Sequence, residues 1–172
     1  MKLKSILLAS VLCLNLSALS IGEVPKQVSI SDDNGGLVKD ESAWNSATLK
    51  GKVFVMFYVD PDEKNLNNDF SAALKAKKYD RANYGSIAII NLAASWKPNF
   101  AIENALKHKQ EEFPDTLYVK DKNRVLVNEW ALADDNSDIV IFAKNGKVLF
   151  HKDGEMQEEE IKQALKIIEE NL

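Results

Sequence analysis

Cysteine is almost absent from this 172-residue chain, whose one copy, Cys13, lies in an apolar stretch near the N-terminus. Without that stretch, the chain has no residue that could form a disulfide, act as a thiol nucleophile or bind a metal as a thiolate. Histidine is also scarce, with two residues far apart in the sequence. A zinc site built from cysteine and histidine is therefore not expected.

The first twenty residues have the three regions of a secretory signal peptide. Lys2 and Lys4 form a short positive region, residues 6–16 are apolar, and residues 18–20 place small side chains where a signal peptidase recognises them. The apolar region is shorter than the roughly 20 residues that a lasting membrane span needs. We therefore expect a cleaved signal peptide over residues 1–20, with the mature chain starting at Ile21.

The rest of the chain is acidic and has no long apolar run. The net charge is −4, from 22 basic and 26 acidic residues, and it falls to −6 when the two lysines of the signal region are removed. A nucleic-acid partner is not expected, because phosphates require a basic face. No further segment is long enough to cross a membrane, and residues 21–172 suffice for one domain with a single core.

Hydrophobic patterns after residue 50 predict alternating strands and helices. Apolar runs predict buried strands, 3.6-residue periodicity predicts helices, and Asn145-Gly146 predicts a hairpin turn. A small hairpin is expected within residues 22–40, where turn residues surround a short alternating segment. The predicted strands are 53–59, 86–92, 117–120, 139–142 and 147–151, with 125–127 as a further candidate; the predicted helices are 63–78, 98–112 and a final one after Gly154. This order is typical of an α/β domain with a parallel core and an antiparallel edge.

The order of elements, with Leu49-Lys50-Gly51-Lys52-Val53 before the first core strand, resembles the thioredoxin-like superfamily. The stretch 139–165 resembles the final hairpin and helix of that superfamily. More narrowly, the chain resembles the YtfJ family of periplasmic, thioredoxin-like proteins from Gram-negative bacteria, which have no established activity. The segments that carry this narrower resemblance are Trp44-Asn45-Ser46-Ala47, Gly51-Lys52-Val53, Glu63-Lys64-Asn65, Trp130 and Lys152-Asp153-Gly154. The resemblance implies a three-layer sandwich with a mixed central sheet flanked by helices, and a periplasmic location.

Two departures from the redox members of that superfamily bear on activity. Redox members carry a Cys-x-x-Cys pair at the end of the first core strand, where a helix stabilises the thiolate; here that place holds Asp60-Pro61-Asp62-Glu63. They also carry a cis-proline before the hairpin strand, and here that place holds Ser137. Thiol–disulfide exchange and thiol peroxidase chemistry are therefore excluded for the mature chain, and fold resemblance alone does not restore them.

Carboxylates occupy both replaced positions. Asp60, Asp62 and Glu63 follow the first core strand, and the 134–138 segment precedes the hairpin, so the fold should bring them together at the carboxyl end of the sheet. Asp60, Asp62, Asp134 and Asp138 are thus candidate oxygen ligands for calcium or another divalent cation. Asp134-x-Asn136-x-Asp138 has the spacing of the first three ligands of a calcium-binding loop, but Ile139 stands where that loop needs glycine and Asn145 where it needs glutamate. The failed match favours solvated turns in which an aspartate caps the next helix. Trp96 is expected near the same end of the sheet.

An enzyme is the alternative hypothesis. A buried strand that ends in Asp60-x-Asp62 also resembles the start of haloacid-dehalogenase-type phosphatases, although Lys64 stands where that family has threonine or valine. The alternative is therefore a divalent-cation-dependent hydrolase or phosphatase built on Asp60–Glu63 and Asp134–Asp138. The favoured hypothesis is a periplasmic, non-redox, thioredoxin-like binding or accessory module without a cofactor, whose partner is a periplasmic protein or small ligand.

Overall fold

The computed structural model describes residues 18–172, so the predicted signal region up to residue 17, with Cys13, lies outside the described part. The strands are β1 (Ser29–Ile30), β2 (Gly35–Leu37), β3 (Trp44–Asn45), β4 (Val53–Val59), β5 (Tyr84–Asn91), β6 (Thr116–Asp121), β7 (Ser137–Phe142) and β8 (Val148–Asp153). The α-helices are α1 (Asn68–Lys77), α2 (Asn99–Glu112), α3 (Val125–Trp130) and α4 (Glu158–Asn171). None of the helices in residues 18–172 is long and apolar enough to span a bilayer.

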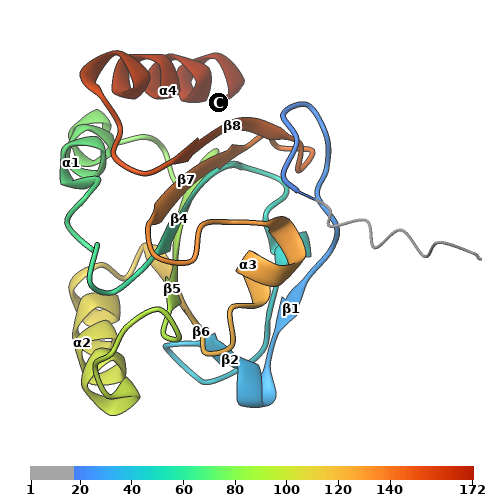
Figure 1. Ribbon diagram of the computed structural model, residues 1–172. Helices are drawn as coiled ribbons and strands as arrows, with labels where there is room; N and C mark the ends of the chain where they lie inside the picture. Colours follow the sequence, from blue (N-terminus) through green and yellow to red (C-terminus); the bar gives the residue numbers. More distant parts are fainter. Residues whose placement is uncertain (1–17) are drawn as a thin grey trace, which may run out of the picture.

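Six strands form the central sheet, in the order β2-β6-β5-β4-β7-β8 (Figure 1). β4, β5 and β6 run parallel, whereas β2, β7 and β8 are each antiparallel to the neighbour they join. The apolar run Val53–Val59 became the central strand β4 because it has a hydrogen-bonded neighbour on both edges and packed layers on both faces. The predicted α/β class, with a mixed sheet that is parallel in its core and antiparallel at its edge, is confirmed.

Two layers cover the sheet. α1, α2 and α4 lie on one face, where the buried side chains of Phe70 and Ile168 pack against Val55 of β4. α3, the two-stranded β1–β3 sheet and the N-terminal segment lie on the other face (Figure 1). That second face contains the two largest fully buried side chains, Trp44 and Trp130.

The N-terminal segment is tied to this second face by backbone hydrogen bonds. The N–H of Leu19 donates to the carbonyl of Trp130 at 3.3 Å, and the N–H of Gly22 donates to the carbonyl of Val148 at 2.8 Å. The N–H of Val148 donates in turn to the carbonyl of Glu23 at 2.9 Å. The segment therefore covers the start of β8, the outer strand of the sheet.

The segment Val125–Val127, a candidate strand by its apolar composition, is wrong as a strand and forms the first turn of α3. The carboxylate of Asp121 explains the difference, because it accepts hydrogen bonds from the N–H groups of Val125 at 2.9 Å and Leu126 at 3.1 Å. Leu126 and Trp130 then fall on one buried helix face. A side chain four residues upstream thus satisfies the donors that a helix start leaves open.

The predicted hairpin within residues 22–40 is also wrong, because its strands pair with more distant partners. β1 pairs with β3, and β2 joins the edge of the central sheet beside β6. Gly35 is needed for this second pairing, since its φ is 118° and a Cβ there would lie 2.0 Å from the carbonyl oxygen of Lys120. The short strands near the N-terminus therefore serve long-range contacts.

Candidate functional site

Polar side chains gather where β4, β5 and β6 end. Asp60 follows β4, Asn91 ends β5, and Asp121 ends β6; all three are buried. Loops that carry Asp62 and Asp134 approach the same end of the sheet. The N–H of Asp60 donates to the carbonyl of Asn136 at 2.9 Å, which confirms that the loop after β4 meets the loop before β7.

Asp60 is 5% exposed, and one of its carboxylate oxygens accepts a hydrogen bond from the N–H of Asp62 at 2.8 Å. Burial raises the pKa of the Asp60 carboxyl, and the nearby charges of Asp62 and Asp135 raise it further, against the opposing effect of that hydrogen bond and of Lys97. Asp60 therefore holds a proton more readily than an exposed aspartate does.

Asp62 lies in the opposite electrostatic setting. Its carboxylate accepts a hydrogen bond from the hydroxyl of Ser95 at 2.9 Å and forms an ion pair with Lys97. The Lys97 and Ser95 hydrogen bonds lower the pKa of the Asp62 carboxyl. Asp62 thus fastens the loop after β4 to the segment between β5 and α2.

Asp134, in the loop before β7, and Asp138, the second residue of β7, each have a separate partner. Asp134 pairs with Arg124 at 2.8 Å and accepts a hydrogen bond from the side-chain amide of Asn91 at 2.9 Å. Asp138 is fully buried, accepts from the N–H of Ala133 at 2.9 Å, and lies 2.7 Å from the imidazole Nε2 of His151. Burial raises the pKa of the Asp138 carboxyl, and the hydrogen bond to His151 opposes that rise.

The four predicted metal ligands therefore share one end of the sheet but have different neighbours. Within residues 18–172, no group of three or more aspartate, glutamate, histidine or cysteine side chains lies close enough together to hold a metal ion. Asp62, Asp134 and Asp138 already contact Lys97, Arg124 and His151. The divalent-cation site stays a prediction, and a calcium titration followed by calorimetry would test it.

Sequence reasoning missed a clamp around Asn67, which is 7% exposed. Its side-chain amide donates to the hydroxyl of Ser137 and to the carbonyl of Gly154, both at 3.1 Å. Its oxygen accepts from the N–H of Met156 at 2.9 Å. Ser137, at the place of the redox members' proline, thus belongs to a hydrogen-bonded junction that joins α1, β7 and the segment before α4. A lone asparagine after a turn-rich segment carried no signal for this role.

The two most exposed large apolar side chains of the described residues lie in the loop that carries Lys97 and in the helix that follows it. Trp96 is 85% exposed and Phe100, four residues later in the first turn of α2, is 70% exposed. Trp96 stands between Ser95 and Lys97, both of which contact Asp62, so its predicted position at this end of the sheet agrees with the contacts. The Lys97 ammonium also lies 5.8 Å from the centre of the Trp96 ring.

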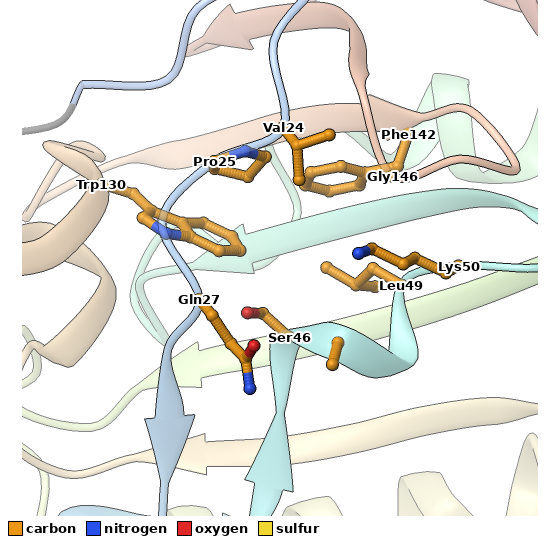
Figure 2. A pocket seen from close by; sticks show the side chains of 10 residues that line it. Val24, Pro25, Gln27, Ser46, Leu49, Lys50, Trp130, Phe142 and Gly146 are labelled. Atoms are coloured by element: carbon orange, nitrogen blue, oxygen red, sulfur yellow. The ribbon is translucent and has the colours of Figure 1, made fainter.

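A small pocket lies away from this site, on the second face. Figure 2 shows Trp130, Phe142 and Leu49 around it, with the segment from Val24 to Gln27 passing over the sheet. Its free volume is about 30 Å³, which is room for one water molecule. The pocket therefore offers no space for a larger ligand.

A family model described as "Bacterial protein of unknown function (YtfJ_HI0045)" matches residues 21–171. The uncharacterised protein YtfJ of Escherichia coli (strain K12) is 28% identical over 148 residues, which cover 81% of this chain and 80% of that protein.

Solved structures show the same fold at lower sequence identity. A thiol-disulfide isomerase from Corynebacterium glutamicum has a TM-score of 0.58 at 16% identity, covering 90% of this chain and 96% of its own. An exposed lipoprotein thioredoxin from Streptococcus pneumoniae strain TIGR4 has a TM-score of 0.54 at 15% identity, covering 82% and 98%. At such identities the likeness shows the thioredoxin-like fold alone.

Proposed function

Because the chain belongs to the YtfJ_HI0045 family of bacterial proteins of unknown function, we propose that it is an exported, periplasmic, thioredoxin-like module that binds a partner protein without thiol chemistry. The charged, apolar and small-residue regions of the first twenty residues support export. The observation that carries binding is the exposed aromatic pair, Trp96 and Phe100, at the carboxyl ends of the strands.

The absence of redox chemistry follows from which atoms occupy the site. Residues 18–172 contain no cysteine, and Asp60–Glu63 stand at the end of β4. Thiol exchange needs a thiolate as nucleophile, and carboxylates do not form the mixed disulfide. In an insulin-reduction assay the purified protein should match buffer alone, and sustained turnover above that blank would contradict this part of the proposal.

The aromatic pair has the composition of a protein-binding hot spot. Tryptophan is among the residues that contribute most binding energy at interfaces, and exposed aromatics bordered by polar groups mark interaction sites. Here the border consists of Ser95, Lys97 and Asp62, whose ion pair and hydrogen bond hold the Trp96 loop in place. A partner with an apolar surface bordered by polar groups fits this patch.

Photo-cross-linking in the periplasm tests the binding role. A benzoyl-phenylalanine at position 96 should give one discrete adduct, whereas the same group at Lys144, an exposed residue of the β7–β8 hairpin turn, should not. The partner identified in the adduct is then purified, and Trp96→Ala should weaken its binding by about 30-fold, as loss of a hot-spot residue does. Equal cross-linking at both positions, or unchanged affinity of the variant, would overturn the proposal.

A further inference from the structure

A groove on the second face lies along one edge of β1. Within residues 18–172, β1 belongs to a two-stranded sheet whose other member is β3, so no described strand lies beside its second edge. In Figure 2 the segment that carries Gln27 runs between the helix of Trp130 and the segment that carries Ser46. The groove lies on the helix side of β1, between residues 26–29 and 123–129, and has a volume of about 400 Å³.

The extended segment 27–30, which includes β1, has backbone groups on the groove side as well as on the side of β3. The carbonyl of Val28 accepts from the N–H of Ser46 at 2.9 Å, and the N–H of Val28 donates to the Ser46 hydroxyl at 2.9 Å, so Val28 faces β3. Backbone groups alternate in direction along a strand. The N–H and carbonyl groups of Gln27 and Ser29 therefore point to the opposite edge, toward α3.

The groove is lined mainly by polar residues, with Val28 and Val125 among them, and its lining carries no net charge. The ion pair between Lys26 and Glu129 lies at one end. At the other end, the side-chain amide of Asn123 donates to the side-chain oxygen of Asn34 at 2.9 Å. Exposed Asn128 of α3 faces β1 from the opposite wall. Charges that cancel, together with amide groups on both walls, complement an uncharged ligand that both donates and accepts hydrogen bonds.

We propose that this groove binds a short, uncharged, extended polypeptide segment that adds a strand to the free edge of β1. Main-chain groups of such a segment match the donors and acceptors of Gln27 and Ser29 at the strand spacing, which is the basis of recognition by strand addition. Its side chains reach the amide of Asn128 on the facing wall. The site is separate from the aromatic pair of the proposed function, so either can fail without the other.

The test uses a blocked, uncharged peptide, acetyl-Thr-Val-Thr-Val-Thr-amide, added to the isotope-labelled protein. Saturable amide shifts should concentrate in residues 26–29 and 123–129, and hydrogen exchange of the Gln27 and Ser29 N–H groups should slow. The same peptide N-methylated at every residue should not bind, because no main-chain donor of its own residues is left on either edge. Shifts spread over other faces, or no saturation at millimolar peptide, would overturn the proposal.

Position 29 supplies a matched pair of variants. Ser29→Pro removes the N–H that points to the groove and leaves the backbone hydrogen bonds to β3 in place, as proline at a strand edge allows. It also loses the hydrogen bond from the Ser29 hydroxyl to the Trp44 carbonyl, but Ser29→Ala loses the same bond, so the pair of variants differs in the backbone N–H. Peptide affinity of the proline variant should fall about fivefold or more, the effect of a lost hydrogen bond. Ser29→Ala keeps that N–H and should bind as the parent does. If the proline variant does not fold, Asn128→Ala on the exposed wall of α3 should still weaken binding.

Two further measurements, one with a saccharide and one without any ligand, separate the alternative occupants of the groove. Maltotriose, an uncharged molecule rich in hydroxyl groups, should leave residues 26–29 unshifted, because a saccharide has no strand backbone to pair with β1. Sedimentation should find the same oligomeric state at low and high protein concentration without peptide. Saccharide binding in the groove, or self-association that protects the Gln27 and Ser29 amides, would overturn the polypeptide assignment.

Discussion

Removing the side chain of Asn67 is the sharpest available perturbation of the junction at the carboxyl end of the sheet. Asn67→Ala deletes three hydrogen bonds, to Ser137, Gly154 and Met156. Each intramolecular hydrogen bond contributes about 1 kcal/mol net, and a buried group left without a partner costs about 1–3 kcal/mol. We therefore expect the free energy of unfolding to fall by about 3–4 kcal/mol, a large share of the stability of a domain this size.

Urea unfolding followed by circular dichroism measures this loss, with Asn68→Ala as the matched control. Asn68 is exposed, and its side chain makes one long contact, 3.4 Å to Asn65. The control should stay within about 0.5 kcal/mol of the parent, as surface substitutions usually do. The m-value should be the same for all three proteins, because the surface exposed on unfolding does not change.

A double-mutant cycle isolates the contact between Asn67 and Ser137. Ser137→Ala alone removes one hydrogen bond, so the two changes together should cost less than the sum of the separate losses, by about 1 kcal/mol. If Asn67→Ala costs no more than Asn68→Ala, or if the two changes add without coupling, Asn67 does not join the three elements and the reasoning fails.

Further predictions concern the aspartates, a glycine and the aromatic pair. Burial raises the folded pKa of Asp60 above its unfolded value, so the folded state binds the proton more tightly and this group makes the protein more stable as pH falls from 7 toward 4. Asp60→Asn should remove this gain of stability at low pH. Asp62→Asn should instead remove a loss of stability at low pH, because the folded pKa of Asp62 is lowered. Identical stability–pH curves for the two variants would contradict these assignments. Gly35→Ala should cost several times more free energy of unfolding than Gly51→Ala, since a Cβ at Gly35 meets the Lys120 carbonyl and a Cβ at Gly51 meets nothing within 4 Å; chemical denaturation of both variants decides this. Trp96→Ala should leave the melting temperature unchanged while it weakens partner binding, because the side chain is 85% exposed; a large drop in melting temperature would show a structural role instead.

The central strands and the long helices were predictable because their signals are local. A seven-residue apolar run such as Val53–Val59 predicts a buried central strand, and the amphipathic pattern of α4 predicts a helix with one buried face. The short elements were not predictable, because distant groups decide them. The carboxylate of Asp121 sets the start of α3, and the carbonyl of Lys120 requires glycine at position 35.

The location of the candidate site could be predicted from the sequence, but the partner of each carboxylate could not. Fold resemblance placed the Asp60 and Asp134 loops at one end of the sheet, and the contact between Asp60 and Asn136 agrees. Each carboxylate contacts a particular cationic side chain or amide because of the geometry of its loop. The residue pattern in the sequence does not determine that geometry. The role of Asn67 likewise depends on three groups 70 to 89 residues away in the chain.

The hydrogen bonds between Gly22, Glu23 and Val148 have a consequence for the order in which the chain acquires its structure. They join the start of the described chain to its last strand, 125 or more residues later, and contacts of such long sequence separation form late and raise the contact order of the fold. The N-terminal segment cannot make these hydrogen bonds until β8 is in place. We therefore expect the start of β8 to stay uncovered through most of folding and to gain its last backbone partners late.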